Sequence, residues 1–310
     1  MALDLVGHIE LPAHSGPGGF DHAAVHQGRR HLWVAHTAND ALDLIDCATH
    51  RYLGSVGGLK HVAGTLVSEP RDLVFTSNRG EDTVGLFTPG REGVAKVKVG
   101  IRPNGLAHDP GRNVLIAANV GDPGVPGSFT VSVVDGEREA LVGEVPVPGR
   151  TRWAVFHEGL DAFFVNIAAP PEIVVIEAGD PRRVARTLPV PAAGPHGLDL
   201  DPRGQRLFCA CDAGVLVCLD ARSGEVLGHC GLSGVPDVVL FNPALDHLYV
   251  AVGDPGVIDV VDTVALRRVE TVPTEPGAHT LAFDPVEDAV FAFLPDTHRA
   301  AVYRVGGGSR

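Results

Sequence analysis

The sequence repeats one unit from end to end, and this repeat limits the possible folds more than any other feature. The clearest copy runs from Gly194 to Leu232 and contains four short segments of alternating apolar residues: LDLD, RLFCAC, VLVCLD and EVLGHC. The turn-forming clusters DPRGQ, DAG and ARSG separate them. Each copy therefore predicts one antiparallel sheet of four strands.

Seven copies can be aligned on the hairpin turn between the first two predicted strands. The alignment places one residue of each copy at the start of the first strand, here called the ring position: His22, Ala63, Asn104, Arg152, His196, Asp237 and His279. Consecutive ring positions are 41 to 48 residues apart. Four strands per repeat of this length are typical of a β-propeller. We therefore predict an all-β fold, a seven-bladed β-propeller forming a single domain over residues 1–310.

The two ends of the chain predict how the ring closes. The seventh copy, from about Glu275, supplies only three strands, and a lone strand at about residues 3–12 precedes the first copy. We expect this N-terminal strand to join the last blade as its outer strand, since closure removes an exposed sheet edge. The blades are expected at about residues 19–58, 59–100, 101–149, 150–191, 192–233, 234–274 and 275–306.

Several repeats resemble a known propeller family. HLWVAHTANDALDLIDCAT, NVLIAANVGDPGVPGSFTVSVVD and HLYVAVGDPGVIDVVDT are similar to the YVTN-type repeat, in which an apolar strand ends in Asn-x-Gly-Asp and a V-x-V-I-D strand follows. The resemblance covers essentially the whole chain and implies a seven-bladed propeller. It also implies kinship with a superfamily of lactonases, streptogramin-type lyases, quinoprotein-like folds and interaction scaffolds.

The amino-acid composition limits which binding partners and which cellular compartment we expect for this protein. The net charge of −13 argues against nucleic acid or an anionic membrane as a partner, because both require a basic face. The start of the sequence has no positively charged leader, and no segment is long and apolar enough to span a membrane. Five cysteines without a framework spacing indicate reduced, buried thiols. We expect a cytoplasmic protein, and the oligomeric state is left open.

The ring positions are the candidate functional site, because their side chains should converge at one mouth of the central channel. Neutral imidazole binds zinc, copper, iron and nickel. His22, His196 and His279 therefore predict a site for a divalent transition metal, with Asp237 as a fourth ligand or an orienting carboxylate. Arg152 and Asn104 are expected to hold an anionic or carbonyl-bearing substrate, with His61 nearby.

Three functions follow from this ring and stay open at this point. The first is a metal-dependent hydrolase or lyase acting on a small molecule, with Asp237 and Arg152 as catalytic residues. The second is a non-enzymatic interaction scaffold with a structural ring. The third is a metal-free lactonase or isomerase that uses a ring histidine as base, whose activity would survive chelation.

Other polar residues are expected to be structural. His26, His108 and His157 recur near the opposite hairpin turn, and Trp153 is expected in the core. The turn after the second strand of each copy carries Asn or Asp, which stabilise tight turns locally: Asn39, Asn78, Asn119, Asp122, Asp212, Asp254 and Asp296. Glu81 and His298 lie on the same predicted face and are candidates for supporting the ring.

Overall fold

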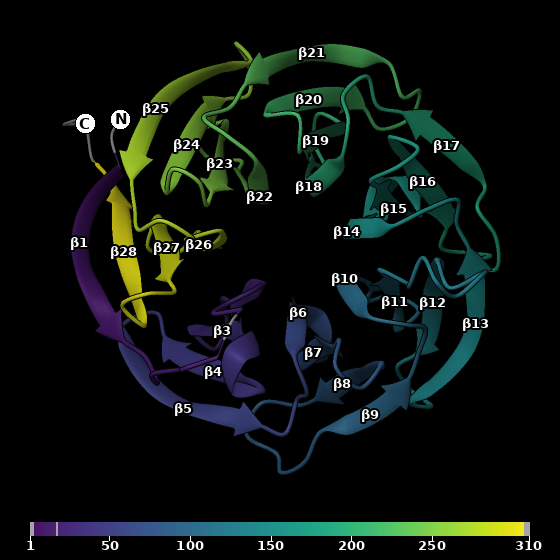
Figure 1. Cartoon of the computed structure of the whole chain (residues 1–310), viewed down its shortest axis with the longest axis horizontal. Helices are drawn as coiled ribbons and strands as arrows, with labels where there is room; N and C mark the ends of the chain where they lie inside the picture. Colours follow the sequence, from purple (N-terminus) through teal and green to yellow (C-terminus); the bar gives the residue numbers. More distant parts are fainter. Residues whose placement is uncertain (1–2, 17, 307–310) are drawn as a thin grey trace.

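Seven four-stranded antiparallel sheets are arranged around a central channel in the computed structural model, which describes residues 3–16 and 18–306 (Figure 1). The predicted seven-bladed propeller is therefore confirmed. In each blade the first strand faces the channel and the fourth lies at the rim.

The first three blades follow the chain in order. Blade 1 consists of β2 (Ala23–His26), β3 (His31–His36), β4 (Ala41–Asp46) and β5 (Arg51–Gly57). Blade 2 consists of β6 (Val62–Ser68), β7 (Leu73–Asn78), β8 (Thr83–Phe87) and β9 (Ala95–Lys98). Blade 3 consists of β10 (Pro103–Asp109), β11 (Val114–Asn119), β12 (Thr130–Asp135) and β13 (Ala140–Pro146).

The next three blades repeat the arrangement. Blade 4 consists of β14 (Thr151–His157), β15 (Ala162–Ile167), β16 (Glu172–Glu177) and β17 (Arg186–Pro189). Blade 5 consists of β18 (Pro195–Asp201), β19 (Arg206–Cys211), β20 (Val215–Asp220) and β21 (Val226–Gly231). Blade 6 consists of β22 (Pro236–Asn242), β23 (His247–Val252), β24 (Val257–Asp262) and β25 (Arg267–Pro273).

Blade 7 closes the ring by joining the two ends of the chain. It contains β26 (Thr280–Asp284), β27 (Ala289–Leu294) and β28 (Arg299–Val305), and its outer strand is β1 (Leu3–Glu10). β1 pairs antiparallel with β28 from Leu3 opposite Val305 to Glu10 opposite Arg299. The predicted closure by the N-terminal strand is confirmed.

Short 3-10 helices occupy three turns: η1 (Thr37–Asn39), η2 (Glu69–Arg71) and η3 (Glu158–Leu160). Within residues 3–16 and 18–306, no helix is long and apolar enough to cross a membrane. All five cysteines are free, and four of them are fully buried. The compartment stays a prediction.

The core lies between the blades. The buried apolar residues of the described chain form seven clusters, and each cluster joins two adjacent blades. The middle strands supply most of this surface: the burial pattern of β15 is buried at every position, whereas the outer strand β5 is mostly exposed. Burial of the alternating apolar faces against neighbouring blades therefore fixes the ring and the position of the seven innermost strands.

Candidate functional site

Close packing around the channel begins at the ring positions. Glycine follows the ring residue in blades 2, 3 and 5, as Gly64, Gly105 and Gly197. A Cβ atom there would lie 2.2, 2.4 and 2.1 Å from the carbonyl oxygens of Asn104, Arg152 and Asp237, respectively. These glycines therefore let the ring residue of the next blade approach closely, which brings the polar side chains of several blades together at one mouth of the channel.

His196 contacts neighbouring side chains through both of its ring nitrogens. Its Nδ1 lies 2.7 Å from Oδ1 of Asp212, and its Nε2 lies 3.1 Å from Nη1 of Arg152. Because the carboxylate accepts the Nδ1 proton, the neutral ring keeps its lone pair at Nε2, where Arg152 donates. Burial alone would raise the pKa of Asp212, but the hydrogen bond from His196 and the charge of Arg152 outweigh it and lower that pKa.

A second set of contacts lies beside the first. Arg79 donates from Nη2 to Oδ2 of Asp21 at 3.1 Å and to Oδ1 of Asn104 at 2.7 Å. Oδ1 of Asp237 lies 3.4 Å from Nε2 of His196, an electrostatic contact rather than a short hydrogen bond. Of the predicted substrate-binding residues, Arg152 and Asn104 therefore both lie in polar contacts at the mouth.

Three arginines lie at the mouth together with the carboxylates Asp21, Asp212 and Asp237. Desolvation, followed by the like charges of Arg152 and Arg79, lowers the pKa of Arg150, which places the three guanidinium groups in one neighbourhood. Within the described residues, Nε of Arg79 and Nε of Arg152 are buried and have no hydrogen-bond partner. Buried N–H donors are normally satisfied, so a movement of either side chain that exposes its Nε–H would offer this donor to an acceptor at the mouth.

The channel is closed just below the mouth by an aromatic pair. His22 of blade 1 and Trp153 of blade 4 stack with their ring centroids 3.9 Å apart and their planes 31° apart. Desolvation lowers the pKa of His22, in spite of the nearby carboxylates Asp21 and Asp237, so the ring is neutral near pH 7. Trp153 is thus a channel residue that also packs against neighbouring blades, which corrects the expectation of a purely core residue.

The described structure does not bring the predicted metal ligands His22, His196 and His279 together as one group. Both ring nitrogens of His196 are in contact with Asp212 and Arg152, and a guanidinium beside Nε2 repels a metal cation. His279 is half-buried, and its Nδ1 contacts the carbonyl oxygen of Gly277 at 2.8 Å. Among residues 3–16 and 18–306, no three His, Cys, Asp or Glu side chains are arranged to hold a metal ion. Metal binding by His22, His196 and His279 therefore stays a prediction.

His61 lies outside the set of interacting ring side chains. It is exposed, with a left-handed backbone at φ 44°, and its backbone N–H donates to Oδ1 of Asp40 at 2.7 Å. A role in substrate binding stays a prediction. Glu81 contacts Lys96, and His298 contacts His14, so neither supports the ring through these contacts.

Several residues of the mouth were missed by sequence reasoning, Arg150 among them. Asp212 was expected to stabilise its own turn, yet it orients His196, because the pairing of Pro195 with Cys211 brings the end of β19 beside the ring position. Arg79 follows β7 in the same way and reaches Asn104 of the next blade. The signal in the sequence is shared: both follow the second strand of their copy, on the face of the ring positions.

Three histidines also meet at the closure of the ring. Nδ1 of His14 lies 2.9 Å from Nε2 of His36 and 3.2 Å from Nδ1 of His298. His36 is buried, and its Nδ1 lies 2.7 Å from Oδ2 of Asp43. Desolvation and the neighbouring His36 and His298 lower the pKa of His14. This cluster ties the segment after β1 to blades 1 and 7.

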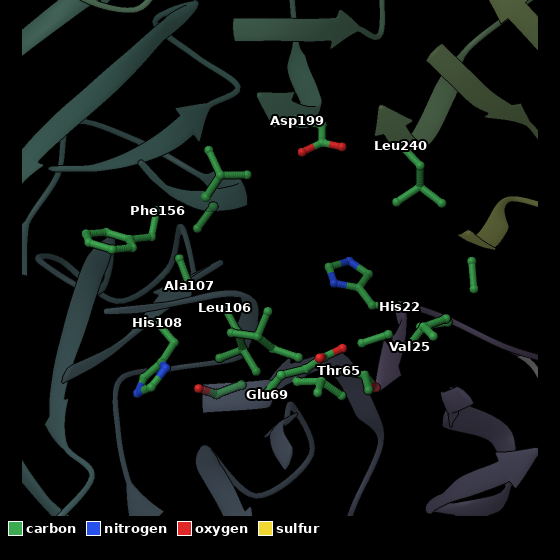
Figure 2. A pocket seen from close by; sticks show the side chains of 18 of the residues that line it. His22, Val25, Thr65, Glu69, Leu106, Ala107, His108, Phe156, Asp199 and Leu240 are labelled. Carbon is green, nitrogen blue, oxygen red and sulfur yellow. The ribbon is translucent and has the colours of Figure 1, made fainter. Parts of the chain in front are cut away.

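A cavity of about 590 Å³ extends from the aromatic pair along the channel toward the opposite hairpin turns. Figure 2 shows His22, Leu240 and Asp199 pointing into it, with Glu69 and His108 farther along the wall. Among the described ring-position residues, His22 alone belongs to the lining. His108, expected to be structural, lines this space. The molecule is therefore a seven-bladed propeller with a polar channel mouth and a separate cavity behind an aromatic barrier.

Comparisons with known proteins agree with this fold. A comparison with known protein families gives no match. The chain is 24% identical over 268 residues to the uncharacterized protein YncE of Salmonella typhimurium, covering 84% of this chain and 65% of the relative. YncE of Salmonella typhi gives the same identity and coverage. The chain thus spans a little under two thirds of the length of these curated relatives.

A solved structure supports the same architecture. The chain is similar to a chain titled Kuenenia stuttgartiensis hydrazine synthase, with a TM-score of 0.82 and 15% sequence identity, covering 95% of this chain and 97% of the other. At this identity the likeness shows the fold alone. The predicted resemblance to YVTN-type propellers is confirmed by the seven blades and the YncE relatives together.

Proposed function

We propose that the channel mouth binds a small organic anion, such as a carboxylate or a phosphate ester. The observation that carries this proposal is the gathering of Arg79, Arg150 and Arg152, with two buried Nε–H donors lacking partners among the described residues. Guanidinium groups suit planar, two-point binding of carboxylate and phosphate.

The pair of His196 and Asp212 supports proton transfer on the bound molecule. Asp212 fixes the Nδ1 proton, so Nε2 is the basic atom, and Arg152 is the group that now contacts it. When Arg152 turns to the ligand, Nε2 becomes free to take a proton from a carbon next to a carbonyl or from an attacking water. This chemistry corresponds to a metal-free isomerase or lactonase. A metal-dependent hydrolase or lyase stays a prediction from the sequence.

Anion binding can be tested by calorimetry with succinate and inorganic phosphate as probes. Arg152→Gln should weaken the Kd of the bound probe about tenfold or more, because a charge-assisted hydrogen bond is lost. Arg51→Gln, which removes an exposed arginine from the outer strand β5, is the matched control and should leave the Kd unchanged. Failure of both probes to bind, or an equal Kd for Arg152→Gln and the native protein, would overturn the proposal. Binding without turnover of any lactone would favour the non-enzymatic scaffold.

A further inference from the structure

The seven residues that lie three positions after the ring residues form one level of the channel wall, here called a tier, and only one of them is charged. Three residues beyond each ring position, all seven innermost segments contribute to the cavity wall, and six of these positions are aliphatic: Val25, Leu66, Ala107, Val155, Leu240 and Ala282. The seventh, in blade 5, is Asp199. A carboxylate is not needed to fill this level of the channel, because the other six blades have an aliphatic residue at the same position.

Asp199 has hydrogen bonds but lacks a countercharge. Its Oδ1 accepts from the backbone N–H of Leu200 at 2.8 Å, and its Oδ2 accepts from that of Phe241 at 2.7 Å. A carboxylate can accept about four hydrogen bonds, so each oxygen keeps capacity toward the cavity. Among the described residues, no Lys, Arg or His nitrogen lies within 4.0 Å of it, and no Lys or Arg lines the cavity. Burial raises the pKa of Asp199 to about 6, so it is mostly ionised at pH 7.5.

The cavity is large enough for a small organic molecule and is mostly apolar. Its volume of about 590 Å³ falls within the range of ligand pockets. Phe156 and Phe283 line its sides, and the stacked rings of His22 and Trp153 form its end. A carboxylate without a countercharge in a mostly apolar cavity favours a cation with an apolar body, since the carboxylate attracts the charge and the walls bury the body.

We propose that this cavity is a second binding site, separate from the mouth, which takes an apolar molecule carrying a protonated amine. The amine pairs with Asp199, and the apolar part lies against Leu240, Phe156 and Phe283. Asp199 is half-buried and has no countercharge among the described residues, so a bound amine would supply the charge partner that this carboxylate lacks. This proposal does not depend on anion binding at the mouth.

The test compares 4-phenylbutylamine with 4-phenylbutanol, which share a shape and differ in charge. Calorimetry at pH 7.5 should give a Kd for the amine about tenfold lower than for the alcohol, and Asp199→Asn should abolish this preference. The location is checked through Trp153 emission in a Trp33→Phe background, because Trp33 and Trp153 are the two tryptophans of the chain. Binding in the cavity should change that emission.

Matched controls separate the site from general attraction of cations to an acidic protein. Asp4→Asn removes one exposed carboxylate from β1 and should leave the preference for the amine unchanged. In the native protein the preference should fall between pH 8 and pH 5, as Asp199 becomes protonated. His22, His108 and Glu69 also line the cavity, so the same titration of Asp199→Asn measures their share.

Three outcomes would overturn the proposal. These are failure of both probes to bind, an equal Kd for amine and alcohol in the native protein, and an unchanged preference in folded Asp199→Asn. The pH titration of the native protein decides the question if that variant does not fold. Succinate binding at the mouth is measured separately, so the two proposals fail independently.

Discussion

The channel mouth and the cavity are built by the same seven innermost strands, yet their side chains differ in kind. The mouth holds His196, Asp212 and three arginines in a network of charged contacts. The cavity, three residues farther along each strand, is aliphatic and aromatic apart from Asp199 and a few polar residues toward its open end. The position of a residue along the innermost strand therefore sets its depth in the channel. A substitution in one copy of the repeat changes the chemistry at that depth only.

The difference also shows why one molecule can offer two unlike sites. Trp153 is the only large side chain at the position after the ring residue, where the other blades have Ala23, Gly64, Gly105, Gly197, Val238 and Thr280. Its stacking on His22 separates the arginines of the mouth from the cavity. The barrier is therefore the element that most directly tests whether the two sites are independent.

The largest effect is expected at the mouth. If the protein is a metal-free isomerase or lactonase, His196→Gln should lower kcat by about 10²- to 10⁴-fold, the usual contribution of a general base. The Kd for succinate should change little, because the arginines remain. Turnover assays over a lactone panel, with and without a chelator, check this, and a chelator that abolishes activity would instead restore the metal hypothesis.

Removal of the barrier should have a large effect on stability. Trp153→Ala should lower the free energy of unfolding by about 3 kcal/mol, because it deletes an aromatic side chain packed against His22 and neighbouring blades. Urea unfolding measures this loss, and Trp153→Phe should cost less. The same variant tests whether the stacked rings keep the two sites independent. If they do, succinate and 4-phenylbutylamine should change each other's Kd in Trp153→Ala and leave it unchanged in the native protein.

A smaller effect is expected from the protonation of His22. Its pKa in the folded protein lies below the ordinary 6.5, mainly through desolvation. Between the two values the unfolded chain binds more protons than the folded protein, so stability falls as the pH falls below about 6.5. The melting temperature should therefore drop less between pH 7 and pH 5 in His22→Gln than in the native protein. His8→Gln, at an exposed position of β1, should keep the native pH dependence.

Much of the fold could be predicted because each copy of the repeat contains the sequence signals for its own four strands and turns. Each copy carries its own alternating segments and turn residues, so the number of blades follows from counting copies, and the missing strand of the last copy predicts closure by β1. The ring residues Arg152, His196, Asp237 and Asn104 were placed at the mouth by the same alignment. Sequence register along one strand is sufficient for such statements.

The contacts between blades could not be predicted in the same way. Asp212 and Arg79 were hidden among turn residues, since a local turn and a partner in the channel require the same residue types. The metal hypothesis combined three histidines by type, and the structure shows ring nitrogens of His196 and His279 in contact with other partners. Asp199 was visible in the alignment as the only charged residue three positions after the ring residue, but its place in the wall of a mostly apolar cavity was not.

The sequence by itself determined the number of blades, their strand order and which residues stand at each depth of the channel, because these depend on periodicity along the chain. Tertiary structure decided which side chains meet, because contacts across the channel join residues from blades far apart in the sequence. Trp153 reaches His22 only when seven blades close into a ring of this width. Packing between blades sets that width, and with it the separation of the charged mouth from the apolar cavity.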